Sequence, residues 1–530
     1  ARLDTLPAEH EEILHDAFEA PAPQTGALTR SADEEESPRP AFEETSQFFF
    51  GSVAVGLILP ESNGEADPST EDWTDAERAQ VVSEIVNALD WWAARYPEAN
   101  LSFVYHNAAA ETVPTAVEPI TRPYSDQKYW IADAMDALGF GGTNYFDRVR
   151  AYNNYLRDTY GTDWAFTIFV VDSTNDPDNR FSDGYFAYAY LGGPFMVMTS
   201  GNDGYGPANM DAVAAHEVGH IFRALDQYAA AGQPCNLTSG YLGVENQNSQ
   251  AGNCASNQPS IMRGQIAPFI NHQIDPYAMG QLGWQDGDGN GVPDPVDVGL
   301  VVTNVTRLEA DAPNILTFQG EVMETPFPSP EYRDILINRL QEVYYRVDDG
   351  LWLPVQATDG AFDDYREAFT FTTDPLPAGT HTLTVQTVDN FGKVNEAVIA
   401  VVEVEDPAAG QVETQFTGDD NQGRLTGSEQ VTSVSGVAMQ LGGGVISAVE
   451  YRLDGGDWLP AQPADGAFDS ATEYFTLSIR LADLSPGEHL LEARAMDAWG
   501  NFDSTPAATT LTVQPQTARY TLFLPLMLNK

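Results

Sequence analysis

Residues 209–226 read Asn-Met-Asp-Ala-Val-Ala-Ala-His-Glu-Val-Gly-His-Ile-Phe-Arg-Ala-Leu-Asp. His216 and His220 stand four positions apart, so a helix places both imidazoles on one face, one turn apart. This spacing lets them reach one tetrahedral zinc ion at about 2.0–2.1 Å. Glu217, beside the first histidine, can take a proton from a water molecule that the metal polarises. The stretch therefore predicts a helix that carries a metal site and its general base.

The neighbouring residues strengthen this prediction, because such a short motif can also occur by chance on an ordinary amphipathic helix. Asn209 or Asp211 can cap the helix start, and Asp211 also favours the positive end of the helix dipole. A short apolar strand, 194–200, lies just upstream, and 260–264 reads as a turn that contains Met262. Strand, metal helix, short loop to an acid and methionine turn together form a specific arrangement.

This arrangement resembles the metzincin-type zinc peptidases that use an aspartate as third ligand, such as the snapalysin-like and immune inhibitor A-like peptidases. The specific resemblance covers about residues 190–285. It implies that zinc is bound by His216, His220 and Asp226, and that Glu217 is the general base. It also implies that Met262 lies under the metal, within an α+β zincin (metzincin-like) catalytic domain.

Two residues depart from the family pattern. Arg223 stands where the metzincin pattern has glycine, so the turn out of the helix is in question. If that turn needs a positive φ, arginine is an uncommon and strained choice there. Gly264 stands where some families place a tyrosine, so the resemblance assigns no tyrosine to this site.

Two other residues are alternative third ligands. Glu245 would suit a thermolysin-like arrangement if it lay on a helix, but the Gly-, Asn- and Gln-rich sequence around it reads as a loop. His272 follows Met262 and is a second alternative. Asp226 is favoured over both because a short loop can return it to the metal.

The strand before the metal helix is the expected substrate strand. It comprises Phe195, Met196, Val197, Met198 and Thr199. We expect it to form a sheet edge that faces the cleft, so that an extended peptide pairs with it as an added strand. An interior strand without a free edge is the alternative.

The chain has two cysteines, Cys235 and Cys254, which flank the polar loop between the metal helix and Met262. An even pair that brackets a loop predicts a disulfide, and two buried free thiols are the alternative. Closing this loop would stabilise the fold by about 3 kcal/mol in the chain-entropy model.

An acidic loop follows at 286–297, Asp-Gly-Asp-Gly-Asn-Gly-Val-Pro-Asp-Pro-Val-Asp. Its oxygens match the positions of calcium-binding loops in EF-hands, and it resembles a dockerin or thrombospondin type 3 loop. The expected calcium ligands are Asp286, Asp288, Asn290, the Val292 carbonyl, Asp294 and Asp297. A calcium-stiffened hinge is therefore predicted, with a plain acidic linker as the alternative.

Residues 298–514 contain an internal repeat. Residues 345–354, Tyr-Arg-Val-Asp-Asp-Gly-Leu-Trp-Leu-Pro, parallel 451–460, Tyr-Arg-Leu-Asp-Gly-Gly-Asp-Trp-Leu-Pro. His381 and His489 occupy equivalent positions and are expected to be structural. Short alternating strands separated by turns predict two all-β sandwiches, which resemble immunoglobulin-like or fibronectin type III-like modules.

Length and charge limit the remaining possibilities. A chain of 530 residues is expected to hold roughly three to four domains. Its 25 basic and 78 acidic residues give a net charge of −53, which disfavours nucleic acid and anionic membranes as partners. No apolar run is long enough for a transmembrane helix.

The two ends of the chain differ in character. Residues 1–46 are acidic and proline-bearing, which predicts disorder, with a remnant pro-segment as the alternative. The apolar tail 515–530 is read either as a last strand on the final sandwich or as a short surface-sorting tail that attaches the protein to a cell. The predicted parts are the N-terminal segment 1–46, the zincin domain 47–285, the calcium hinge 286–297, sandwiches at 298–408 and 409–514, and the tail 515–530.

These observations predict an exported zinc metalloendopeptidase that acts on a protein or peptide substrate and is secreted or held at the cell surface. The predicted cofactors are one catalytic zinc ion and a structural calcium ion. The alternative is an adhesion or scaffold protein with a weakly active or inactive zincin domain. Glu217 argues against that alternative, because an enzyme that has lost its activity need not keep its base. A glycan-binding protein would depend on the sandwiches, where no sugar site is evident.

Overall fold

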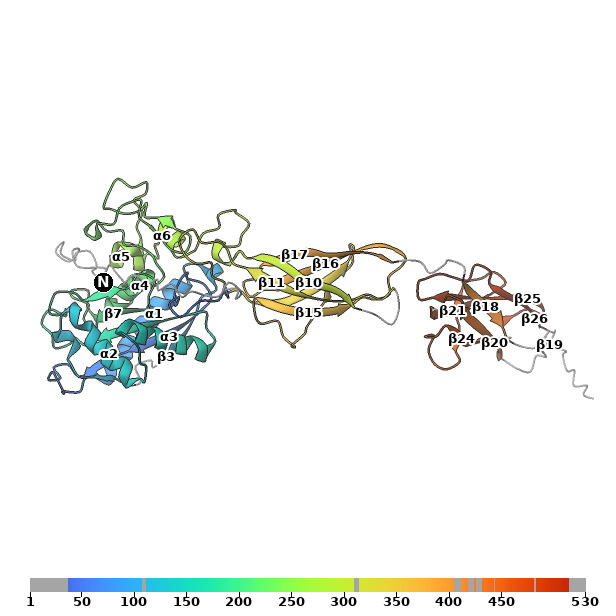
Figure 1. The fold of residues 1–530 in the computed structure, drawn as a ribbon, viewed down its shortest axis with the longest axis horizontal. Coiled ribbons are helices and arrows are strands. Elements are labelled where there is room, and N and C mark those ends of the chain that lie inside the picture. Colours follow the sequence, from blue (N-terminus) through green and yellow to red (C-terminus); the bar gives the residue numbers. More distant parts are fainter. Residues whose placement is uncertain are drawn as a thin grey trace, which may run out of the picture.

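The computed structural model shows a mixed α/β unit followed by two β-sandwich modules in a row (Figure 1). It describes residues 37–106, 111–308, 314–404, 411–417, 424–425, 431–442, 444–480 and 483–513. The predicted disorder of residues 1–36 and both interpretations of the tail 515–530 lie outside the described residues. Across the described ranges, no helix combines the length and apolarity that a bilayer-spanning segment needs.

The first unit is built on a five-stranded sheet with the order β3-β1-β5-β7-β6. Its strands are β3 (Ser102–His106), β1 (Ser52–Ile58), β5 (Trp164–Val171), β7 (Phe195–Thr199) and β6 (Ala187–Ala189). The first four run parallel to one another, and β6 is antiparallel to β7. Strands β5, β6 and β7 are buried along their whole length, which explains why their sequences are apolar without alternation.

Helices cover both faces of this sheet. The helices α1 (Asp75–Ala93) and α4 (Met210–Ile221) share one hydrophobic core with alternate residues of β1 and β5. The helices α2 (Gln127–Ala137) and α3 (Tyr145–Tyr160) share a second core with the opposite face. A capping box formed by Thr74 and Glu77 stabilises the start of α1. Smaller elements are β2 (Pro60–Ser62), β4 (Val113–Thr115), β8 (Thr238–Ser239), β9 (Val244–Glu245), α5 (Ile266–Ile270) and α6 (Pro276–Gln281).

The prediction that Phe195–Thr199 forms a sheet edge is wrong. Strand β7 pairs with β5 on one side and with β6 on the other, with Val197 opposite both Phe169 and Tyr188. An apolar run without alternation is equally typical of an interior strand, and the short strand β6 was not expected from the sequence. The edge strand on this side of the sheet is therefore β6.

The first sandwich consists of two antiparallel sheets, β10-β11-β15-β14 and β13-β12-β16-β17. Phe318, Val322 and Phe369 from the first sheet pack against Val343 and Leu383 from the second. The strands are β10 (Gly299–Leu308), β11 (Thr317–Thr325), β12 (Leu340–Val347), β13 (Leu353–Pro354), β14 (Gln356–Ala357), β15 (Arg366–Thr372), β16 (Gly379–Asp389) and β17 (Val394–Val404).

The second sandwich repeats this plan with the sheets β18-β20-β24-β23 and β19-β26-β25-β21-β22. Its core contains Phe475 and Leu477 of one sheet and Val449, Leu491 and Ala493 of the other. The strands are β18 (Val412–Phe416), β19 (Arg424–Leu425), β20 (Val431–Gln440), β21 (Ile446–Leu453), β22 (Leu459–Pro460), β23 (Gln462–Pro463), β24 (Thr472–Arg480), β25 (Gly487–Asp497) and β26 (Ala507–Val513). The structure thus bears out a pair of β-sandwich modules.

The predicted boundaries between the parts need two corrections. Residues 37–46 are packed rather than disordered: the Leu336 amide donates to the Pro38 carbonyl, and Thr45 and Ser46 are buried. The first sandwich is also not separate from the α/β unit, because its β11–β12 connection, residues 326–339, places Ile335 in the core that contains α1 and α4. Proline-rich sequence reads as a surface loop, so neither contact is evident from local pattern.

Candidate metal centre

The helix α4 owes its position to its small and apolar residues. Residues 212–221 are all buried, which lets the helix lie directly against the sheet and α1. Neither predicted cap acts as an N-cap: Asn209 makes no side-chain cap, and Asp211 instead accepts a hydrogen bond from the Ala212 amide. Burial of the whole helix brings His216, Glu217 and His220 into a region shielded from water.

His216, His220 and Asp226 come together as predicted. The Nε2 atoms of the two histidines are 3.1 Å apart, and Asp226 Oδ1 lies 3.1 Å from His216 Nε2 and 3.5 Å from His220 Nε2. Two ligand atoms at 2.0–2.1 Å from a tetrahedral zinc ion are separated by about 3.3 Å. The three atoms therefore form one face of a coordination tetrahedron of the size that zinc requires.

Backbone carbonyls orient the two imidazole rings. His216 Nδ1 lies 2.9 Å from the Ile261 carbonyl oxygen, and His220 Nδ1 lies 2.7 Å from that of Ala224. A carbonyl can only accept, so each Nδ1 carries the hydrogen and each Nε2 is left with a lone pair. Metal-binding histidines are held in this way in proteins, with the ligand nitrogen facing the ion.

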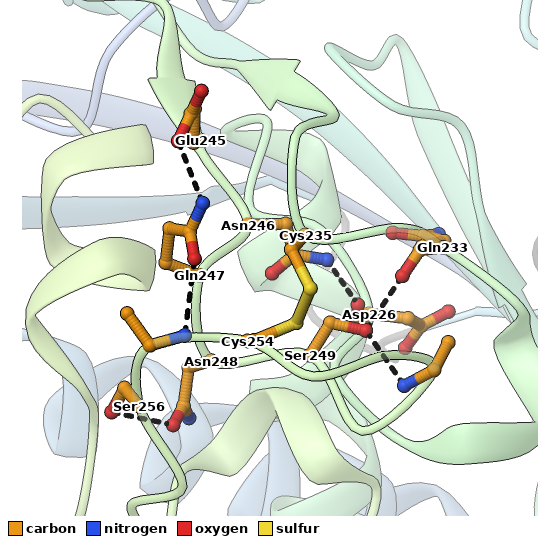
Figure 2. Close-up of a disulfide and its surroundings, with 12 residues drawn as sticks. Asp226, Gln233, Cys235, Glu245, Asn246, Gln247, Asn248, Ser249, Cys254 and Ser256 are labelled. Carbon is orange, nitrogen blue, oxygen red and sulfur yellow. Dashed lines mark hydrogen bonds between the residues drawn. A yellow bond between two sulfur atoms is a disulfide. The ribbon is translucent and has the colours of Figure 1, made fainter.

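Several polar residues fix the loop that carries Asp226. The Asn246 side-chain amide donates to the Asp226 carbonyl at 2.8 Å, and the Leu225 amide donates to Gln281 Oε1 at 2.9 Å. Figure 2 shows Asn246 reaching Asp226 beside the Cys235–Cys254 disulfide. The predicted disulfide is thus confirmed, and it closes residues 235–254, from which Asn246 reaches the Asp226 carbonyl.

Met262 lies directly against the metal helix. It forms part of a single 3-10 turn, Ile261–Arg263, that ends at Gly264 with a φ of 68°. A Cβ atom at Gly219 would lie 2.6 Å from Met262 Sδ, so this approach requires glycine between the two histidines. The turn also supplies the Ile261 carbonyl that orients His216.

The pKa values of the two acids in the site, Glu217 and Asp226, are shifted in opposite directions. Burial raises the pKa of Glu217 and outweighs the attraction of His216 and His220. Burial also acts to raise the pKa of Asp226, but the two histidines outweigh it and hold that pKa below its usual range. Glu217 is therefore suited to holding a proton, whereas Asp226 is suited to remaining an anionic ligand.

The donor set fits a zinc ion. Within the described chain, Asp226 Oδ2 and Glu217 Oε2 are buried and receive no hydrogen bond. Buried carboxylate oxygens normally have a donor or a cation as partner. Two neutral imidazole nitrogens and one carboxylate are ligands that zinc prefers, and a site with three protein ligands keeps a position for water or substrate.

The alternative third ligands lie elsewhere. Among the described residues, His216, His220 and Asp226 are the only three His, Cys, Asp or Glu residues with ligand atoms within 4.8 Å of one another. Glu245 is exposed on β9 and accepts a hydrogen bond from Gln247, and His272 is exposed as well. Neither is placed where it could share an ion with the two histidines.

The acidic side chains of the predicted calcium loop, residues 286–297, are arranged differently from the His216, His220 and Asp226 cluster. Asp286 accepts hydrogen bonds from the amides of residues 289–291, and Asp294 accepts one from the Gly287 amide. Asp297 forms an ion pair with Lys393 and accepts a hydrogen bond from Asn290. The backbone thus follows a tight acidic loop, but its described carboxylates are not gathered as His216, His220 and Asp226 are. Calcium binding by Asp288, Asn290, Val292 and their neighbours stays a prediction.

Reasoning from the sequence missed the residues that support the metal site. Asn246, Asn248 and Gln281 are fully buried amides that hold the loop carrying Asp226. The only signal available was compositional, because the segment around Asn246 is rich in Asn and Gln and stands between the two cysteines. Such a segment reads as an exposed loop unless its side chains have buried partners.

Comparison with known proteins does not assign the chain to a family. No protein-family model matches it, and no curated protein matches it in sequence. Among solved structures, it is similar to OgpA from Akkermansia muciniphila, with 10% identity over 70% of this chain and 97% of that chain and a TM-score of 0.21. It is also similar to the CbhA fibronectin(III)-like modules of Clostridium thermocellum, with 14% identity over 41% of this chain and 94% of that chain and a TM-score of 0.19. Likenesses of this strength carry no argument about function, which must come from the geometry of the site.

Proposed function

We propose that this protein is an exported zinc metalloendopeptidase with a metzincin-like catalytic domain and immunoglobulin-like sandwiches. The observation that carries the proposal is the triangle formed by His216 Nε2, His220 Nε2 and Asp226 Oδ1, with sides of 3.1 to 3.5 Å. Its dimensions, its chemistry and its burial all suit one zinc ion with three protein ligands.

Bound there, zinc would supply Lewis-acid chemistry towards a peptide carbonyl and a water molecule. Glu217 would accept the proton of the attacking water and return it to the leaving amine. Glu217 follows His216 directly on α4, and its Oε2 is buried without a hydrogen-bond partner, so its carboxylate would be available to the water beside the metal. The carbonyls of Ile261 and Ala224 would keep both imidazoles oriented while this proton moves.

A small hollow beside His216 is lined by Val213, Ile266 and the ring of Tyr205. The Tyr205 hydroxyl donates to the Gly264 carbonyl, which holds the ring in place. With a volume of about 10 Å³, the hollow has room for about one water molecule beside His216.

The decisive experiment compares Glu217→Gln with Glu245→Gln, a matched change of a glutamate outside the site. Both variants should retain about one zinc per chain. Only Glu217→Gln should lose peptide cleavage, by at least about a hundredfold, because general-base catalysis contributes that much or more. Peptide-library digestion with metal analysis gives both readouts. Zinc binding without cleavage in the wild-type protein would instead favour the scaffold role, and a wild type that binds no zinc would refute the proposal.

A further inference from the structure

The turn between the second histidine and Asp226 contains a strained residue. Arg223 has a φ of 76°, in the left-handed region that side chains other than glycine rarely adopt. Three positions separate it from both His220 and Asp226. Any change in its backbone would therefore move Asp226 relative to the two histidines. A strained residue persists only where surrounding contacts hold it in place.

Contacts from distant parts of the chain hold Arg223. Its guanidinium carbon lies 4.1 Å from the centre of the Tyr332 ring, a close cation–π contact. Its Nε donates to Gln47 Oε1 at 2.8 Å, and its carbonyl accepts from Ser239 Oγ at 2.6 Å. A Cβ atom at Gly192 would lie 2.7 Å from the guanidinium carbon, so the side chain also fills the space above that glycine.

Tyr332 is itself held firmly, although it belongs to the first sandwich. It lies in the β11–β12 connection, where its amide donates to Ser329 Oγ at 3.1 Å. Its neighbour Arg333 forms an ion pair with Glu44 in the N-terminal segment. The amide of Ile335, three residues after Tyr332, donates to the Tyr241 hydroxyl in the α/β unit. The ring over Arg223 is thus anchored on both sides.

We propose that Tyr332 is a positioning residue for the metal centre: by holding Arg223, it fixes the strained turn that returns Asp226 to His216 and His220. The first sandwich thereby completes the metal site of the α/β unit. This inference rests on the proposed function in so far as zinc is the ion that the three ligands bind.

The strain supplies the test, because glycine adopts a positive φ without penalty. In the full-length protein, Tyr332→Ala should raise the zinc dissociation constant by about tenfold or more, as is common for residues that support metal ligands. In an Arg223→Gly background the turn needs no clamp, so adding Tyr332→Ala should change the zinc affinity by less than about twofold. Tyr332→Phe keeps the ring and should resemble the wild type.

Zinc affinity is measured by competition with a chromophoric chelator, and circular dichroism melting checks that each variant is folded. Tyr474→Ala, which removes an exposed tyrosine from the second sandwich, is the control. Equal losses of affinity from Tyr332→Ala in both backgrounds, or no loss in either, would overturn the inference. Tyr332→Leu replaces Tyr332→Ala if the latter does not fold, since it fills more of the space without a π face. A wild type that fails to bind zinc would refute the proposed function itself, so the two failures are distinguishable.

Discussion

The two sandwiches share strands and sequence motifs but relate differently to the rest of the chain. In the first, residues 326–339 connect β11 and β12, and in the second only residues 441–445 connect the equivalent strands β20 and β21. The longer connection carries Ile335 and Ile337 into the core of the α/β unit. The first sandwich has thus become part of the fold of the α/β unit through a single loop. The second sandwich has only a short connection at the equivalent place.

The second sandwich contacts the first through residues around Trp499. Trp499 joins the hydrophobic core of the first sandwich, and Asn314 donates to the Ala498 carbonyl at 2.6 Å. Figure 1 shows this module at the far end of the row from the α/β unit. We therefore expect changes in the second sandwich to leave the metal centre unaffected.

The largest effect is expected from removing each sandwich in turn. A chain that ends at residue 408 keeps the β11–β12 connection, so it should still bind zinc, and it should melt at a somewhat lower temperature than the full chain because it loses Trp499 from the core of the first sandwich. A chain that ends at residue 297 leaves the space of Ile335 and Ile337 empty and removes the ring over Arg223. It should fail to form a cooperatively folded, zinc-binding unit. Calorimetry and zinc analysis give the result, and equal melting of the two truncated chains would remove the distinction between the sandwiches.

A single core substitution in each module gives the next largest effect. Ile337→Ala should destabilise the unit that holds the metal site by about 2–5 kcal/mol, because the side chain is buried in the shared core. Ile446→Ala makes the matched change in a fully buried residue of the second sandwich. It should lower only the stability of that module. Hydrogen exchange followed by mass spectrometry localises each loss. Faster exchange in α4 of the Ile446 variant would contradict the comparison.

Much of the α/β unit could be predicted because its signals are local. The strand at 195–199, the helix that carries His216 and the methionine turn all follow from residues close in sequence. The spacing of His216, His220 and Asp226 likewise predicted a cluster that the fold does bring together. Local pattern was sufficient because each of these features is specified within a few residues.

The errors concern contacts between segments far apart in the chain. The sequence of β7 cannot reveal that β6 covers its edge, because both strands are simply apolar. Residues 326–339 contain three prolines and read as a surface loop, although Ile335 and Ile337 are buried. The glycine-to-arginine departure at 223 did predict strain, but its partner Tyr332 could be found only in three dimensions.

Equivalent positions in the two sandwiches also differ in charge. Gln440 Nε2 donates to Asp497 Oδ2 at 3.0 Å in the second sandwich. The equivalent position in the first sandwich is Glu324, which lies near Asp389. The Glu324 amide donates to the Tyr365 carbonyl, just as the Gln440 amide donates to the Ala471 carbonyl. Burial, and then the charge of Asp389, raise the pKa of Glu324 to about 8. The first sandwich therefore has a buried titratable group where the second has an amide.

This difference predicts a pH effect confined to the first sandwich. The folded pKa of Glu324 is above its unfolded value of 4.5, so its stabilisation is complete below pH 4.5 and is lost as the pH rises through about 8. Glu324→Gln should remove this dependence and make the protein more stable above pH 8, by about 1.4 kcal/mol for each unit of pKa shift. Urea unfolding at pH 5 and pH 9 measures the effect, with Gln440→Glu as the reverse change. A variant less stable than the wild type at pH 9 would contradict the assignment.

The smallest effect is expected where the two sandwiches are alike. His381 Nδ1 lies 2.8 Å from Asp348, and His489 Nδ1 lies 2.6 Å from Asp454. Each Nε2 also faces a backbone carbonyl, so both ring nitrogens have acceptors and the charged imidazolium is favoured. Asp454 is the main cause that raises the pKa of His489. Burial lowers that of His381, but Asp348 and the carbonyl outweigh it.

Both modules should therefore respond to pH in the same direction at these pairs. A raised histidine pKa gives stabilisation that is complete below the unfolded pKa of 6.5 and is lost as the pH rises through the folded pKa. The aspartates are about half exposed, so each pair should contribute less than about 1 kcal/mol. Nuclear magnetic resonance titration of the two imidazoles should give pKa values above 6.5 for both, and His381→Gln should weaken the first sandwich at pH 5.5 more than at pH 8. If only one of the two histidines had a pKa above 6.5, the modules would differ at this pair, and the prediction that they respond alike would be wrong.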